Sequence, residues 1–178
     1  MTVRKTTLLA LSAILFSACS TGVKFSSKEP VDWTPILKSW ENGCEKSPAM
    51  EIFSKNIAIY SPESKSLLKI GEILLPKKYE AVLGPIQLTE QNFEDDAHSI
   101  FEIEATNSFY YGVPIKKFIF YRGHSTDYIV DEIVFDAPFE AVKEKLKDVD
   151  YQAVWSEMDG DVKAILYEKN GEARLSCL

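Results

Sequence analysis

Apolar residues recur at helical spacing early in the part of the chain that is expected to fold. Large side chains stand at positions i, i+3, i+4 and i+7, namely Trp33, Ile36, Leu37 and Trp40. This spacing lines one face of a helix. A second helix is predicted to begin at Ser47–Pro48, because Met50, Phe53 and Ile57 again fall on one side.

From Ile86 onwards the apolar period shifts from about four towards two. Phe101, Ile103 and Ala105 alternate with Glu102 and Glu104, which is typical of a strand with one buried face. Further strands are predicted over residues 115–121, 127–135, 152–158, 162–168 and 173–178, with a helix beginning after residue 136. The Asn-Gly pair at 170–171 predicts a tight hairpin before the last strand.

This order of elements predicts an α+β fold, with an antiparallel sheet of about five or more strands packed against two to four helices. Strands and helices occur in runs rather than in regular βαβ alternation, which favours that class. Residues 32–178 are expected to form a single domain, because no repeat, low-complexity tract or second boundary interrupts them. The short, polar and aperiodic residues 19–31 are expected to be a tether.

The first 18 residues have the three-part layout of a secretory signal. Arg4 and Lys5 provide the positive charges, and an apolar run follows from Thr6 to Phe16, before the small residues Ser17 and Ala18. The run spans about 13 residues when it is counted to Ala18, whereas a membrane-spanning helix needs about 17–25. The segment is therefore predicted to be a cleaved signal rather than a transmembrane anchor.

The stretch from Leu15 to Cys19, Leu-Phe-Ser-Ala-Cys, resembles the lipobox of bacterial lipoprotein precursors. That family prefers Leu, Val or Ile three residues before the cysteine, and here Phe16 holds this position. The resemblance implies cleavage before Cys19, diacylglycerol on its sulfur and an acylated amino end. It also implies sorting to the outer membrane, because Ser20 rather than Asp follows the cysteine. The alternative is an ordinary signal peptide with an incidental cysteine.

Charge limits the partners that the domain can have. Removing residues 1–18 leaves 18 Lys and Arg residues against 27 Asp and Glu, a net charge of −9. An acidic body repels nucleic acid and anionic lipid headgroups. Attachment to a membrane is therefore expected through lipid on Cys19, and nucleic acid is not an expected partner.

Two cysteines remain once Cys19 carries lipid. Cys44 and Cys177 form an even pair in an exported chain, and such a pair is most simply a disulfide in an oxidising compartment. The bridge would close a very long loop and hold the C-terminal strand against fraying. The alternative is two independent thiols.

The sequence contains no motif of the common catalytic classes. It lacks glycine-rich phosphate loops, H-E-x-x-H, C-x-x-C and G-x-S-x-G. No cofactor or metal site is predicted, and no catalytic residue is assigned.

Three polar groupings have both a chemical and a structural interpretation. His124, with Ser125, Thr126 and Asp127, can form a catalytic group but matches a strand-to-strand turn. A second grouping, His98 with Glu94, Asp95 and Asp96, offers ligands for a metal ion, but its composition is more typical of a solvated acidic loop. The carboxylates are Glu102 and Glu104, Asp131 and Glu132, and Asp159 and Asp161; they offer pairs for a glycosidase, yet a chain with 27 acids supplies such pairs by chance.

Aromatic residues are dense between positions 109 and 121. Alternation sends Phe118 and Phe120 to one face of a strand, and Tyr121 to the other. Tyr110, Tyr111 and Tyr121 are therefore candidate binding residues on an outer face. The alternative is that helices cover both faces and that the aromatic residues belong to the core.

The leading functional hypothesis is a non-enzymatic, membrane-anchored envelope lipoprotein that binds a protein partner as an inhibitor, immunity protein or accessory subunit. This is an argument by class of protein rather than from a site. A small-ligand or lipid-binding periplasmic domain is the alternative. An envelope hydrolase using His124 and an acid is a third hypothesis.

Overall fold

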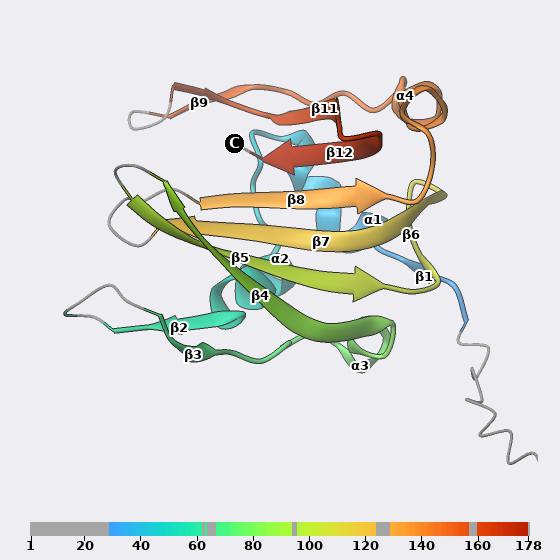
Figure 1. Ribbon diagram of the computed structural model, residues 1–178. Helices are drawn as coiled ribbons and strands as arrows, with labels where there is room; N and C mark the ends of the chain where they lie inside the picture. Colours follow the sequence, from blue (N-terminus) through green and yellow to red (C-terminus); the bar gives the residue numbers. More distant parts are fainter. Residues whose placement is uncertain are drawn as a thin grey trace, which may run out of the picture.

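A computed structural model describes residues 29–61, 63, 67–93, 96–123, 129–156 and 160–177. The predicted α+β class is confirmed, but the sheet is larger than expected and has eight strands (Figure 1). Its strands are β1 (Val31–Asp32), β4 (Leu83–Phe93), β5 (Asp96–Ala105), β6 (Ser108–Tyr110), β7 (Val113–Gly123), β8 (Ile129–Phe135), β11 (Ala164–Lys169) and β12 (Glu172–Cys177).

The main sheet is antiparallel along most of its width. Strands β4, β5, β7, β8, β12 and β11 lie side by side in that order. Strand β6 pairs with the start of β7, and β1 pairs with β6 in parallel. The predicted Asn-Gly hairpin joins β11 to β12, with positive φ angles of 55° at Asn170 and 77° at Gly171.

Short helices and two small hairpins complete the described part of the domain. The helices are α1 (Thr34–Leu37), the 3₁₀ helix η1 (Lys38–Glu41), α2 (Pro48–Asn56), α3 (Lys77–Glu80) and α4 (Phe139–Leu146). The hairpins pair β2 (Ala58–Tyr60) with β3 (Leu67–Ile70), and β9 (Val154–Ser156) with β10 (Gly160–Val162). In Figure 1, α1 and α2 lie behind the sheet, and α4 lies at its upper corner.

The core lies between one face of the sheet and the helices α1, η1 and α2. The four residues predicted to line the first helix are all buried, with exposures of 0–5%. The Trp33 ring lies 4.6 Å from the ring of Phe118, and the Phe53 ring lies 5.0 Å from that of Phe120. Tilted and edge-to-face rings at these centroid distances fill the space between the two layers.

Helix α2 begins where the sequence predicts. Ser47 caps it, because its Oγ accepts a hydrogen bond of 3.3 Å from the Met50 amide. The same hydroxyl donates to the Ile36 carbonyl at 2.7 Å and so ties α2 to α1. Pro48 occupies the first turn, where its missing N–H costs nothing.

Several strands differ from the predicted elements. Strand β4 begins at Leu83, before Ile86, from which the strand period was expected, and it pairs with β5 along almost its whole length. The short strands β2, β3 and β6 were not predicted. Val31 was expected in the tether, but it lies in β1 with 8% exposure and pairs with Ser108. The partner of β1 is distant in sequence, so a local pattern gives little sign of this strand.

Replacing Phe53 by Ala should lower the free energy of unfolding by about 3–5 kcal/mol, because it removes a fully buried ring from the layer between α2 and the sheet. The matched control is Ile52→Ala, one residue earlier on the exposed side of the same helix, where the side chain is 49% exposed. Urea denaturation of both variants measures the difference. Equal losses would contradict the assignment of the core.

Candidate functional site

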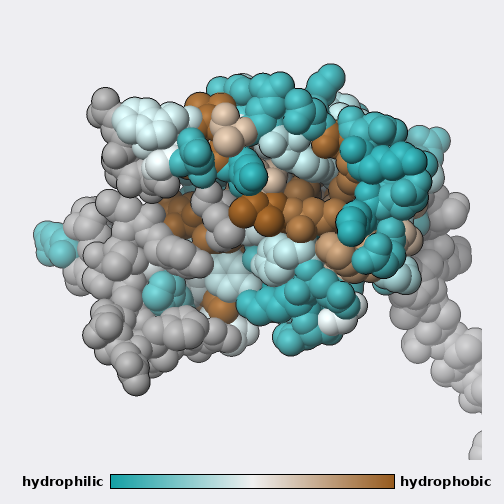
Figure 2. Space-filling view, turned by 90° about the horizontal axis from the view of Figure 1, so that it is seen from above, coloured by the Kyte–Doolittle hydropathy of each residue, from teal (hydrophilic) through white to brown (hydrophobic). Residues whose placement is uncertain are grey.

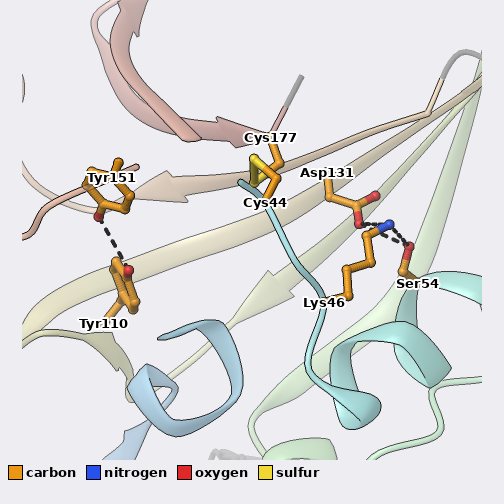
Figure 3. The surroundings of a disulfide bond; sticks show 7 residues. All are labelled: Cys44, Lys46, Ser54, Tyr110, Asp131, Tyr151 and Cys177. Carbon is orange, nitrogen blue, oxygen red and sulfur yellow. Dashed lines mark hydrogen bonds and ion pairs between the residues drawn. A yellow bond between two sulfur atoms is a disulfide. The ribbon is translucent and has the colours of Figure 1, made fainter. Parts of the chain in front are cut away.

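A disulfide joins Cys44 to Cys177, the pair expected from the cysteine count. Cys44 follows η1, Cys177 ends β12, and their Cα atoms are 5.5 Å apart across 133 residues of sequence. In the sheet register Cys177 lies opposite Asp131 of β8. Figure 3 shows the bridge beside Asp131, so the N-terminal segment is covalently held where two central strands meet.

A buried ion cluster, Lys46–Ser54–Arg122–Asp131, lies next to this bridge. The Asp131 carboxylate is 1% exposed, with Lys46 Nζ 2.8 Å from Oδ2 and Arg122 Nη2 2.8 Å from Oδ1. The second contact is an ion pair without hydrogen-bond alignment, since Oδ1 has no hydrogen-bond donor. The cluster connects α2, the segment before α2, β7 and β8 (Figure 3 draws all but Arg122).

The Ser54 hydroxyl makes hydrogen bonds to all three charged side chains of the cluster. Its hydroxyl donates to Asp131 Oδ2 at 3.0 Å, and it accepts from Lys46 Nζ at 3.1 Å and from Arg122 Nη2 at 2.6 Å. Arg122 also donates to the carbonyls of Tyr121 and Val130 at 2.7 and 3.2 Å. A buried charge is tolerated only when it is paired and hydrogen-bonded in this way.

Electrostatics keep the Asp131 carboxyl ionised. Burial alone would raise its pKa, but the positive charges of Arg122 and Lys46 outweigh burial and lower the pKa below its usual value of 3.8. A nucleophilic serine needs a base to take its proton. The carboxylate that accepts the Ser54 proton is a weak base, because its pKa is lowered, and Ser54 is itself buried and accepts from two cations. This arrangement suits a structural role.

The three candidate binding tyrosines do not share a surface. Tyr110 is completely buried, so its expected place on an outer face is wrong. Its hydroxyl accepts a hydrogen bond of 3.3 Å from Tyr151 (Figure 3), and burial raises its pKa far above the ordinary value. Tyr111 is half-buried and donates to Glu41 Oε1 at 2.5 Å, while burial raises its pKa to about 12.

Tyr121 lies on the opposite face of the sheet, as the alternation predicts. There it packs against Ile100, Ile119 and Val134. Its hydroxyl donates to Glu132 Oε2 at 3.3 Å, and burial, followed by the charge of Glu132, raises its pKa to about 12. A phenol with this pKa stays protonated near neutral pH and acts as a hydrogen-bond donor rather than a base.

A second ion pair lies on this outer face beneath Tyr121. Glu132 is 4% exposed, and Arg174 Nη1 donates to its Oε2 at 3.1 Å. Tyr167 donates to its other oxygen, Oε1. The side chains of Asp131 and Glu132 therefore point to opposite faces of β8, as strand alternation requires. They do not form the glycosidase pair considered above.

The remaining candidate groups are only partly described. His124 and its neighbours, Glu94, Asp95 and Asp159 lie outside the described residues. Glu102 forms an ion pair of 2.7 Å with Lys117 on the neighbouring strand β7. Among the described residues, no group of three or more histidine, cysteine, aspartate and glutamate side chains could bind a metal ion.

Most of the exposed hydrophobic residues form two groups. One group lies on α2, β2, β3 and the segment after β3, and consists of Ile52, Ile59, Leu68, Ile70 and Leu74. A second group consists of Val154 and Trp155 in β9 and Ile165 in β11. Figure 2 shows a band of hydrophobic residues between hydrophilic ones on the side seen from above, where β9, β11 and α4 lie.

Trp155 is the most exposed of these residues. Its side chain is 68% exposed, whereas Trp33 and Trp40 are completely buried. Sequence reasoning placed Trp155 in a strand but gave it no role. The buried ion cluster was missed too, although a signal existed. Arg122 directly follows the strand predicted over residues 115–121, in phase with Phe118 and Phe120, and Asp131 lies in phase with Ile133 and Phe135 of the next predicted strand. Opposite charges at such inward-facing positions must pair.

Two grooves open on the described surface. One, of about 450 Å³, is lined by Pro48, Ala49, Ile52, Leu74, Leu75, Pro76 and Glu80. The other, of about 600 Å³, is lined by Glu29, Pro30, Val31, Asp32, Pro35, Lys78, Ala81 and Val82. The first groove is almost entirely apolar and belongs to the first group of exposed residues.

The helices in the described ranges are too short or too polar to span a membrane. Compared with protein-family models, curated proteins and solved structures, the chain matches no family, protein or structure. Its function is therefore argued from its own residues.

Replacing Cys44 and Cys177 together by Ala should lower the free energy of unfolding by about 5 kcal/mol, because the bridge restricts a very long loop in the unfolded chain. Denaturant unfolding measures the loss. Dithiothreitol should reproduce it in the wild type and change nothing in the double variant. A wild type that is equally stable with and without reductant would contradict this role for the bridge.

Replacing Asp131 by Asn should destabilise the fold by about 3–5 kcal/mol at pH 7, because it leaves the buried Arg122 and the half-buried Lys46 without their counter-ion. The exposed acid Asp148, replaced by Asn, is the control and should cost almost nothing.

The same variant tests the pKa of Asp131. A carboxyl whose folded pKa lies below 3.8 stabilises the fold above that pH, and this contribution is lost as the pH falls through the folded pKa. The difference in unfolding free energy between wild type and Asp131→Asn should therefore be constant above about pH 5 and shrink in more acidic buffer. A difference that grows on acidification would contradict the lowered pKa.

Proposed function

We propose that this chain is an envelope lipoprotein, anchored to the outer membrane by lipid on Cys19, whose domain binds a protein partner. The signal layout and the Leu-Phe-Ser-Ala-Cys stretch support the anchor. The Cys44–Cys177 bridge supports export, because structural disulfides persist in oxidising compartments. The acidic composition supports attachment through lipid rather than through a basic surface.

The observation that carries the binding role is the exposure of Trp155. A folded domain normally buries a side chain of this size, and Trp33 and Trp40 follow that rule here. Tryptophan is also enriched among the few residues that dominate the energy of protein interfaces. An exposed tryptophan in a folded domain is therefore best explained by a partner that covers it.

Inhibition, immunity or an accessory role in an envelope machine all fit such an anchored binding domain. The anchor keeps the domain at high local concentration where its partner arrives. The described residues favour the small-ligand alternative less, because interlocked aromatic rings fill the layer between sheet and helices. They also favour a hydrolase less, because the Ser54 hydroxyl is buried inside the ion cluster, where a substrate has no access to it.

Two measurements on intact cells test the proposal with the full chain. The wild type should fractionate with membranes and incorporate labelled palmitate, whereas Cys19→Ser should do neither, because it has no sulfur to carry the lipid. A short lysine-reactive cross-linker should then join the wild-type protein to a defined protein partner. The matched control is residues 1–31 fused to an unrelated domain, which keeps the anchor and removes the proposed binding surface.

Each half of the proposal can fail on its own. Membrane attachment of Cys19→Ser at the wild-type level would refute the lipid anchor. Recovery of the same proteins from the wild type and from the fusion would refute binding by the domain.

A further inference from the structure

We infer that the β9–β10 hairpin is the docking element, and that Trp155 inserts into an apolar pocket of a protein partner with a basic rim. This inference rests on the proposed protein-binding function and names its surface and the chemistry of its partner. Three features of the hairpin carry it: an exposed apolar side chain, a fixed root and an acidic residue opposite the tryptophan.

The hairpin stands apart from the main sheet. Strand β9 pairs with β10 alone, with Trp155 opposite Asp161 and Val154 opposite Val162. Trp155 does not belong to the buried core, and its exposure of 68% leaves most of the indole available for contact. Burying an aromatic ring of this kind supplies a large share of the free energy at the centre of an interface.

The root of the hairpin is fixed by the segment that carries Cys44. The Gln152 amide donates to the Glu41 carbonyl at 2.8 Å, and the Gly43 amide donates to the Gln152 carbonyl at 3.0 Å. Gly43 has a φ of +58°, and a Cβ there would lie 2.4 Å from the Cβ of Val154. Any side chain at residue 43 would clash with Val154, so this position requires glycine.

The disulfide at Cys44 therefore also anchors the neighbourhood of the hairpin. A surface element that is held in place before binding loses less conformational entropy when its partner arrives. The hairpin is thus a preorganised support for Trp155 rather than a loop that must be ordered on contact.

Charge decides the chemistry of the partner. Among the described residues of β9 and β10, Asp161 is the one charged side chain. It is exposed and directly opposite Trp155. An acid beside an apolar anchor is complemented by lysine and arginine around the receiving pocket, and it disfavours anionic lipid surfaces and nucleic acids.

The position of the hairpin fits a partner away from the membrane. In Figure 1 the described chain begins at β1 on the right, and β9 lies at the upper left. An anchor that precedes β1 therefore leaves the β9 end of the domain free to meet a protein.

Site-specific photo-cross-linking in intact cells tests this inference. A benzophenone amino acid replaces Trp155 in the full-length, lipidated chain, and matched chains carry it at Ile52 and at Leu68, which are 49% and 63% exposed in the other apolar group. Position 155 should give one discrete protein adduct at a yield at least tenfold above the other two positions. Mass spectrometry of the cross-linked peptide should place the adduct in an apolar site flanked by lysine and arginine.

Reversal of charge provides the second readout. Asp161→Lys in the chain labelled at position 155 should lower the adduct yield about tenfold, because like charges then face each other. Glu140→Lys, the same change on exposed helix α4, should leave the yield unchanged. Unchanged unfolding midpoints for both variants show that the effect is not loss of the fold.

The failures of the two proposals are distinguishable. Adducts from position 52 or 68 but not from 155 would overturn the hairpin inference and leave protein binding standing. No protein adduct from any of the three positions would count against both. An adduct at 155 with glycan or lipid, or one mapping to an acidic or uncharged protein surface, would overturn the assigned partner.

Discussion

The fold depends on the junction at which the segment before α2 meets strands β8 and β12. Two interactions of different kinds fix it: the Cys44–Cys177 bond, and the ion pairs of Asp131 with Lys46 and Arg122. The helices behind the sheet are short, and α1 has only four residues. Isolated helices of that length are unstable in water, so they need this attachment as well as the packing of Trp33 and Phe53. The same junction holds the root of the β9–β10 hairpin.

Buried charge on both faces of the central strands is the second constraint. Asp131 points towards the helices and Glu132 points away, and each is paired with an arginine, Arg122 and Arg174 respectively. Such pairs add little to stability compared with apolar packing, but leaving one member unpaired is costly. A strand shifted by one residue would exchange the two carboxylates between faces and separate them from their partners. The ion pairs therefore help to fix the register of β8 against β7 and β12.

The proposed function requires a membrane attachment at one end of the domain and a protein-binding surface at the other. The eleven residues from Cys19 to Glu29 can reach at most about 35 Å, so the domain would stay close to the membrane that carries it. A binding surface is then most useful at the far end, and the hairpin with Trp155 lies there (Figure 1). Its acidic character agrees with that of the whole chain, whose net charge is −7. Electrostatic attraction would speed the encounter with a basic partner, and the indole would supply the lasting contact.

Local periodicity determined the class of the fold and the buried faces of α1, α2 and β7, because these depend on spacing along the chain. The Asn-Gly pair determined the hairpin before the last strand, and the number of cysteines determined the pairing of Cys44 with Cys177. The N-terminal signal pattern, likewise local, is the basis of the proposed lipid anchor. Only the tertiary structure decided the partner of β1, the burial of Tyr110 and the exposure of Trp155. Whether an aromatic side chain is core or surface depends on which distant segment covers it, and that information is absent from its neighbours in sequence.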